Sequence, residues 1–323
     1  MFSCHLSTSL RHTLQMMMLR RPISKLCKLE ERRRKKKRGG LVAKAPAAVP
    51  PATVAGTRPT ATPGGSAALL VACQGGTTCQ ARELLPAADV NFSVTGVGVT
   101  LLAAAAARGE TRLVSLLLSA GADAYAHDAH GQSPLIVAAQ GGHAGVAELL
   151  LSRGYADARH VSASGRDALM EAAAAGSCEC IEVVVERGAA DVDVACGRSG
   201  ATPLLLAAAS GHLRAVKALL AHGASVDRAD ASWATPLHAA AASGDTAMVV
   251  VLLRHGARSA VADTRGRTPL MAAAERGAAD TVEALLRAGD AGAAAAAADD
   301  AGCSVLQLTG SPRVSIMRFS MLA

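Results

Sequence analysis

The stretch RGRTPLMAAAERG, residues Arg265 to Gly277, returns in related forms along the chain. With Leu270 as its marker, a comparable leucine recurs at spacings of 33, 33, 34, 35, 33, 33 and 36 residues. A repeat of this length predicts a stacked array of similar units rather than an ordinary globular domain. The markers are Leu69, Leu102, Leu135, Leu169, Leu204, Leu237, Leu270 and Leu306.

Each unit carries the signals of two short helices. A residue that can cap a helix stands two positions before each marker from Leu102 onward, and proline often follows it. Glycines seven and nineteen residues after the marker are predicted to end the first and the second helix in left-handed conformations. The capping residues are Thr100, Ser133, Asp167, Thr202, Thr235, Thr268 and Ser304. The glycines are Gly76, Gly109, Gly142, Gly176, Gly211, Gly244 and Gly277 for the first helix, and Gly121, Gly154, Gly188, Gly223, Gly256 and Gly289 for the second.

These combined features resemble the ankyrin repeat family. The best matches are GATPLLLAAASGH, Gly200 to His212, and ATPLHAAAASGD, Ala234 to Asp245. The resemblance covers about Gly65 to Leu306 and implies an all-α solenoid of about seven helix-turn-helix units and a partial one, joined by hairpin-like loops. It also implies a protein-binding role without catalysis.

Several positions depart from the family pattern. Asp167-Ala168-Leu169 replaces Thr-Pro-Leu, and Trp233 stands where the loop glycine is expected. Extra residues lie between Gly188 and Thr202 and between Gly289 and Ser304. Because loops absorb insertions at low entropic cost, we expect irregular loops there and an unbroken array.

Charge divides the chain into unequal parts. Residues 1–63 contain 14 Lys/Arg and 2 Asp/Glu, a net charge of +12, whereas the remainder contains 19 and 24, a net charge of −5. We therefore predict three regions: a disordered basic leader with an Ala/Pro-rich linker over 1–63, a repeat domain over 64–306, and an irregular tail over 307–323. The array stops in mid-unit after Leu306, which favours a shortened form of a longer protein.

The leader contains seven consecutive cations, and the main hypothesis for them is a nuclear import signal. Contact with nucleic acid or an anionic membrane is the second possibility, and a solvated extension without a specific role is the third. Residues 1–25 hold no acidic residue and several Ser and Arg, which also fits an organellar transit peptide. The seven cations are Arg32, Arg33, Arg34, Lys35, Lys36, Lys37 and Arg38.

Catalytic and metal sites find little support in the sequence. There is no phosphate-binding loop ending in Lys-Ser/Thr and no nucleophile elbow. Cys178-Glu179-Cys180 lacks a second pair for zinc, and the eight irregularly spaced cysteines are predicted to be reduced. His127, His130 and His238 are assigned structural roles, with His238 expected to bond backbone. We predict no cofactor, no metal, no small-molecule substrate and no membrane insertion, and the acidic, aromatic-poor repeats disfavour nucleic acid.

A binding surface is the remaining functional feature. The resemblance implies a concave face built from the loop tips and the exposed side of the first helices. The residues at those positions suit an acidic or phosphorylated segment of a partner, with Trp233 as the aromatic anchor. They are His130, Gln132, Gln140, Arg166, Arg198, Trp233, Arg265, Arg267, Glu275 and Arg276.

The sequence thus favours a non-catalytic protein-interaction module or scaffold in the cytoplasm or the nucleus. One alternative is a substrate-receptor or regulatory subunit of an enzyme complex, such as a ubiquitin ligase or a phosphatase. Another is a transcriptional regulator that uses the basic leader. The transit-peptide pattern leaves an organellar location open.

Overall fold

The computed structural model describes residues 63–94, 97–152, 154, 156–288 and 299–300. These residues all belong to one unit, Thr57–Ala323. The basic run Arg32–Arg38, the rest of the leader before residue 63, the insertion after Gly289, the partial unit at Ser304 to Leu306 and the tail 307–323 lie outside the described residues.

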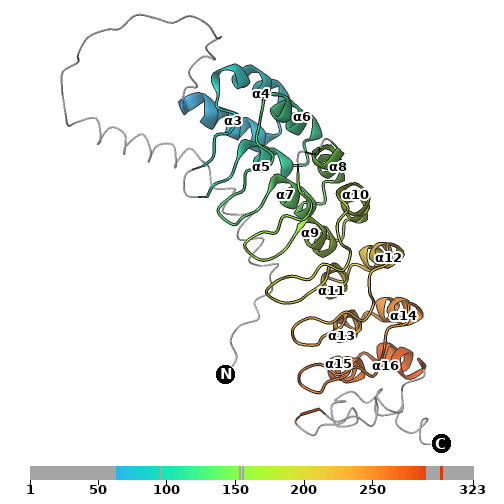
Figure 1. Ribbon diagram of the computed structural model, residues 1–323. Coiled ribbons are helices and arrows are strands. Elements are labelled where there is room, and N and C mark those ends of the chain that lie inside the picture. The colour runs from blue at the N-terminus through green and yellow to red at the C-terminus, as the bar shows by residue number, and fades with distance from the viewer. Residues whose placement is uncertain (1–62, 95–96, 153, 155, 289–298, 301–323) are drawn as a thin grey trace, which may run out of the picture. The chain divides into compact units, whose positions relative to one another are not determined.

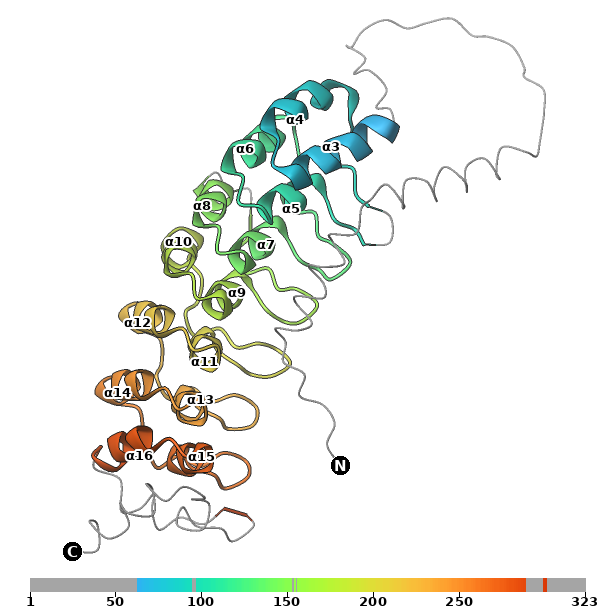
Figure 2. The ribbon, with the colours of Figure 1, turned by 180° about the vertical axis from the view of Figure 1, so that it is seen from behind.

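The described part is all-α, and its helices form two rows (Figures 1 and 2). The first helices of the units are α3 (Pro63–Gly75), α5 (Leu101–Ala106), α7 (Pro134–Gln140), α9 (Ala168–Ala175), α11 (Pro203–Ala209), α13 (Pro236–Ser243) and α15 (Pro269–Arg276). The second helices are α4 (Thr78–Leu84), α6 (Thr111–Ser119), α8 (Ala144–Ser152), α10 (Cys178–Gly188), α12 (Leu213–Ala221), α14 (Thr246–Arg254) and α16 (Ala279–Leu286), and the short 3-10 helix η1 (Leu85–Ala87) follows α4. In both views the loops project from the first row, on the side away from the second row.

The predicted caps start the first helices. The side-chain oxygens of Thr100, Ser133, Thr202 and Thr268 each accept a bond from the backbone N–H three residues later. Asp167 caps α9 in the same way, through the N–H of Met170 at 2.8 Å. These oxygens satisfy N–H groups that no helical carbonyl can reach.

The marker leucines form a continuous core between the rows. Every marker from Leu69 to Leu270 is at most 1% exposed, and the alanine pairs that follow them are buried as well. Because alanine adds little bulk, successive first helices can pack closely on one another, as α7 packs on α9 and α13 on α15. The stack is therefore held by one core that passes through all the described units.

The helix-ending glycines are confirmed among the described residues, with one correction, and Gly289 lies outside the described residues. The glycines after the first helices have φ between +70° and +78°, a left-handed conformation that favours glycine. At Gly188 the prediction is wrong, because α10 continues through it and Ala189 takes the left-handed conformation at φ 46°. Gly188 is needed for a different reason: a Cβ there would lie 2.7 Å from the Cβ of Ala158.

Candidate functional site

The loop tips are closed by aspartates that bond their own backbone. Asp128, Asp230 and Asp263 each accept bonds from the N–H groups two and four residues later, at 2.8 to 2.9 Å. These three carboxylates are therefore engaged inside the loops, and each fixes the conformation of the adjoining tip.

Backbone hydrogen bonds join neighbouring tips. Between consecutive loops an N–H of the later tip donates to a carbonyl of the earlier one, at 2.8 to 3.1 Å. This backbone bond, here called a rung, is missing between loops 162–166 and 196–201. There the carbonyl of Ser164 accepts from the thiol of Cys196 at 3.6 Å instead of from a backbone N–H. Loop 196–201 is one residue longer than loops 128–132, 162–166, 230–234 and 263–267: the N–H of Cys196 bonds the carbonyl of Ala201, five residues ahead rather than four. The rungs are Ala129 to Val97, Ala163 to His130, Ala231 to Ser199, Thr264 to Ser232 and Asp300 to Arg265.

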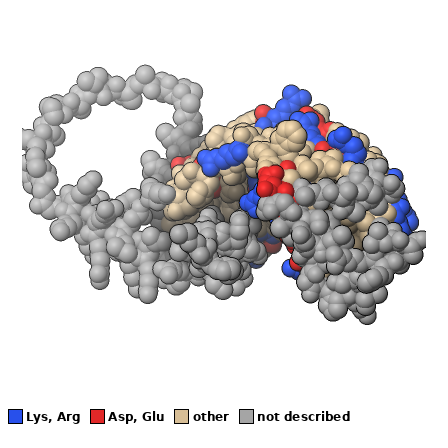
Figure 3. All heavy atoms as spheres, turned by 90° about the horizontal axis from the view of Figure 1, so that it is seen from below, with Lys and Arg blue, Asp and Glu red and all other residues tan. Residues whose placement is uncertain are grey.

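The predicted binding residues fall into three positions. Four of them belong to loop tips, three lie at the base of a loop just before a first helix, and three end a first helix. The surface visible in Figure 3 carries scattered Lys and Arg, with several Asp and Glu, among uncharged side chains. The tip residues are His130, Arg198, Trp233 and Arg265; the loop-base residues are Gln132, Arg166 and Arg267; the helix-end residues are Gln140, Glu275 and Arg276.

Arg267 is engaged within its own unit. Its guanidinium contacts Oδ2 of Asp263 through Nε at 3.1 Å and Nη2 at 2.9 Å, and Glu275 at 3.6 Å. Burial raises the pKa of Asp263, but the N–H groups of Arg267 and Arg265 and the guanidinium outweigh it, so that the pKa lies below its usual value. The predicted group of four charged residues therefore contains an internal ion pair, Arg267 with Glu275, while Arg265 and Arg276 are exposed and form no ion pair with a described residue.

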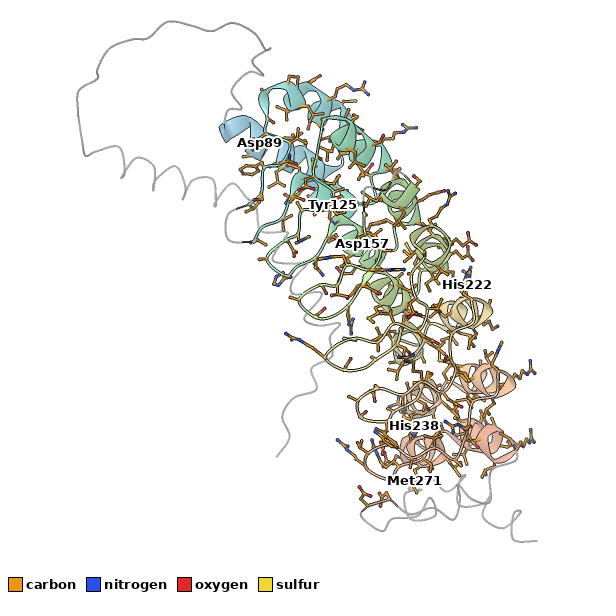
Figure 4. The ribbon with its side chains drawn as sticks, viewed as in Figure 1. Asp89, Tyr125, Asp157, His222, His238 and Met271 are labelled. Atoms are coloured by element: carbon orange, nitrogen blue, oxygen red, sulfur yellow. The ribbon has the colours of Figure 1, made fainter. Side chains whose placement is uncertain are left out.

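His238 bonds backbone, as the sequence predicts. Its Nδ1 accepts from the N–H of Thr235 at 3.1 Å, and its Nε2 lies 3.0 Å from the carbonyl of Arg267 in the next unit (Figure 4). Nδ1 is thus an acceptor, so Nε2 carries the proton and donates. Burial lowers the pKa of His238, which keeps the ring neutral and suited to this bridge.

Trp233 combines exposure with backbone strain. Its side chain is 64% exposed and its φ is +60°, whereas Gly131, Gly165, Gly200 and Gly266 occupy the same place in other loops at φ between +68° and +79°. A left-handed conformation costs an L-residue about 1–2 kcal/mol, and strain of this kind gathers at functional sites. Trp233 is therefore an exposed and strained departure from the repeat pattern.

A model of ankyrin repeats in three copies matches residues 69–160, 155–230 and 228–295. The chain belongs to the ankyrin repeat family. Among solved structures, the human ASB11 ankyrin repeat domain aligns with a TM-score of 0.61 and 28% identity, covering 68% of this chain and 96% of that one. The ankyrin repeat domain of Bcl-3, described as a unique member of the IkappaB protein family, aligns with a TM-score of 0.57 and 29% identity, covering 68% and 97%.

One curated relative is an enzyme. Tyrosine-protein kinase HTK16 of Hydra vulgaris is 36% identical over 92 residues, which make up 28% of this chain and 12% of the kinase. The match lies in the ankyrin repeats of this chain and spans about an eighth of the length of the kinase. Ankyrin repeats are generally non-catalytic interaction modules, and the described architecture is that of such a module.

Asp167, which follows loop 162–166, was predicted from the sequence only as a cap, and the burial of its carboxyl group was missed. Asp167 is 3% exposed, and burial raises its pKa to about 6 despite the bonds from the N–H groups of Met170 and Leu169. Glu171, 8% exposed, adds repulsion and pairs with Arg166 at 3.6 Å. The sequence does contain a sign of this buried charge, because Asp167 occupies the capping position whereas the other caps are neutral Ser or Thr.

Histidines of two neighbouring ankyrin loops meet face to face. The rings of His127 and His160 stack with centroids 4.5 Å apart and planes at 17°, and Nε2 of His160 lies 2.8 Å from the carbonyl of Gly131. Sequence reasoning gave His127 a structural role without naming His160 as its partner. His130 is exposed at the same tip, and its carbonyl accepts from the N–H of Ala163.

The described residues contain neither a cluster suited to a metal ion nor a helix suited to span a membrane. No group of three or more His, Cys, Asp or Glu in this part of the chain is arranged to hold a metal ion. None of the described helices is long and apolar enough to cross a membrane. Of the two cysteines set aside as a zinc pair on the sequence alone, Cys180 is buried and its pKa is raised by that burial, while Cys178 is half-buried.

Proposed function

We propose that this protein is a non-catalytic scaffold that holds a protein partner against its loop tips and the adjoining ends of its first helices. The observation that carries the proposal is Trp233, a large apolar side chain kept exposed at a strained loop position. Interface hot spots are enriched in Trp and Arg, and exposed Arg198, Arg265 and Arg276 occupy the same side of the units.

The polar interior supports this assignment. No buried side-chain nitrogen or oxygen in the described part lacks a hydrogen-bond partner. Polar groups that the fold needs are therefore satisfied internally, so the exposed tip and helix-end side chains can vary without disturbing the core. A scaffold of fixed units that presents changeable side chains suits partner recognition.

Affinity purification of the full-length chain followed by quantitative mass spectrometry tests the proposal. Trp233→Gly is the test variant, because glycine is the residue of the other loops. Lys217→Ala, an exposed substitution on α12 in the second row, is the matched control. We expect proteins that are enriched by the wild type and by the control variant but lost with Trp233→Gly. No protein recovered above background by the wild type would contradict the proposal, and equal recovery with all three proteins would exclude Trp233 from the binding surface.

Two more specific roles are proposed as alternatives: a substrate-receptor or regulatory subunit of an enzyme complex, and a transcriptional regulator. Co-purification of a ubiquitin ligase or phosphatase catalytic subunit would favour a receptor or regulatory subunit. For the transcriptional regulator we propose nuclear import through Arg32–Arg38, supported only by the sequence of that run. Nuclear accumulation of a fluorescent fusion should disappear when the run is deleted, whereas import of residues 1–30 into an organelle would contradict it.

A further inference from the structure

Trp233 stands in a row of loop tips whose neighbouring positions have no side chain. The equivalent residue is Gly200 in the preceding loop and Gly266 in the following one, both at positive φ. The indole therefore has no side chain at the equivalent position on either side along the row. A flat aromatic surface is open to a molecule that lies across the tips.

The three tips around the indole are fixed relative to one another. The N–H of Ala231 donates to the carbonyl of Ser199 at 2.8 Å, and the N–H of Thr264 donates to the carbonyl of Ser232 at 2.9 Å. Within the middle tip, Trp233 N–H donates to the carbonyl of Asp230 at 3.0 Å. A surface that is ordered before binding loses less conformational entropy when a ligand arrives.

The exposed charged residues of these three tips are cations, and the exposed carboxylate residue beside them is Asp300, whose N–H donates to the carbonyl of Arg265 at 3.1 Å. Exposed Arg198 lies on the preceding tip and exposed Arg265 on the following tip, and neither forms an ion pair with a described residue. The carboxylates of the middle and following loops are engaged: Asp230 accepts from the N–H groups of Ser232 and Ala234, and Asp263 pairs with Arg267. The tips thus present cations outward while their anions are engaged in loop closure.

We propose that tips 198–199, 232–233 and 264–265, here called the tryptophan platform, bind an extended acidic segment of a partner protein. An apolar side chain of the segment packs on the indole, and carboxylates on either side pair with Arg198 and Arg265. This inference rests on the proposed scaffold function and names the chemistry of its ligand.

An acidic peptide fits better than a nucleic acid. Residues 64–323 carry a net charge of −5, which repels a polyanion along its whole length, whereas a peptide with a few carboxylates meets only the local cations. Single-stranded nucleic acid also needs successive stacking surfaces, and the described tips offer one indole. Oligonucleotide binding is therefore an outcome that would overturn the inference.

The test uses a displayed library of random short peptides selected on the full-length protein, followed by affinity measurement with the selected peptides made synthetically. We expect the selected peptides to share an apolar residue flanked by Asp or Glu. Trp233→Gly should weaken binding by at least about tenfold, as for a hot-spot residue. Arg198→Gln and Arg265→Gln should each weaken it by about three- to tenfold, and added salt should weaken it further. Lys217→Gln on the second row should leave the affinity unchanged.

The possible failures are distinguishable. If the peptides bind wild type and Trp233→Gly equally but lose affinity with Gln140→Ala or Arg276→Ala, the tryptophan platform is wrong and the scaffold function stands. Selected peptides without acidic residues, or a single-stranded oligonucleotide that competes equally well, would also overturn the acidic-segment inference. If the wild type enriches no peptide and captures no protein in the purification experiment, both proposals fail.

Discussion

Replacing Asp167 by threonine should stabilise the protein at neutral pH. Asp167 caps α9 and is 3% exposed, whereas four other first helices begin with threonine at this position. Threonine is nearly as good a cap as aspartate, so Asp167→Thr keeps the bond to the N–H of Met170 while removing a buried charge. It also relieves the repulsion from Glu171.

The expected size can be worked out from the pKa of Asp167. The pKa rises from an ordinary value of 3.8 to about 6 in the folded protein, because the charged form is buried. At about 1.4 kcal/mol per pKa unit, the charged carboxyl costs about 3 kcal/mol of folding free energy. Since the folded pKa is the higher one, this cost is absent below pH 3.8, grows as the pH rises, and is complete above about pH 6. The stability gained in Asp167→Thr should have the same pH dependence, with about 3 kcal/mol as its ceiling.

Urea unfolding followed by circular dichroism at a series of pH values measures this difference. Thr202→Ser is a suitable control, since it exchanges one neutral cap for another and should give a difference that does not change with pH. A threonine variant that is less stable than the wild type above pH 6, or a difference that is constant between pH 4 and about 7, would refute the electrostatic reasoning.

Three further outcomes depend on single residues. In urea unfolding, Gly176→Ala should lower the free energy of unfolding by about 2 kcal/mol or more, and Gly211→Ala by about 1 kcal/mol. Both glycines have φ above +70°. A Cβ at Gly176 would also lie 2.5 Å from the ring of His212, whereas a Cβ at Gly211 would have no other atom within 4 Å. Equal losses would contradict a steric cause. Trp233→Gly should change the melting temperature little, because relief of about 1 kcal/mol of strain is offset by a similar entropy cost of glycine; a large loss would show that the indole packs on the fold. Asp263→Asn should lower the free energy of unfolding by about 1.5 kcal/mol at neutral pH. Because the folded pKa of Asp263 lies below 3.8, this difference from the wild type should shrink as the pH falls below 3.8 and the carboxylate becomes protonated. A difference that persists at low pH would contradict a contribution from the ion pair.

The fold could be predicted from the sequence because its determinants are local and repeated. A cap, a marker leucine and a left-handed glycine each act within a few residues, and seven copies remove most of the ambiguity of any one. The prediction failed at Gly188, because α10 includes Gly188 as its last residue and the close approach of Ala158, which leaves no room for a Cβ there, joins positions 30 residues apart in the chain. A local pattern carries no information on such a contact.

The candidate site could be predicted only as a set of positions. The repeat register places Arg265, Arg267 and Glu275 on the same side of their unit, but it does not reveal that Arg267 pairs with Asp263 and Glu275. Asp263 and Arg267 are four residues apart in a loop, where that spacing has no fixed geometry. As a result, two of the predicted charges neutralise each other, and the cations that remain exposed lie on the loop tips and at the helix end.

The departures from the repeat unit differ in the direction in which their side chains point. Asp167 replaces a neutral cap and is buried, so its effect is expected in stability and in the pH dependence of unfolding. Trp233 replaces a loop glycine and is exposed, so its effect is expected in recognition, with little change in stability. The two substitutions Asp167→Thr and Trp233→Gly each restore the residue common to the other units. If the first alters unfolding without altering peptide binding, and the second does the reverse, folding and recognition are carried by separate positions of the same repeat.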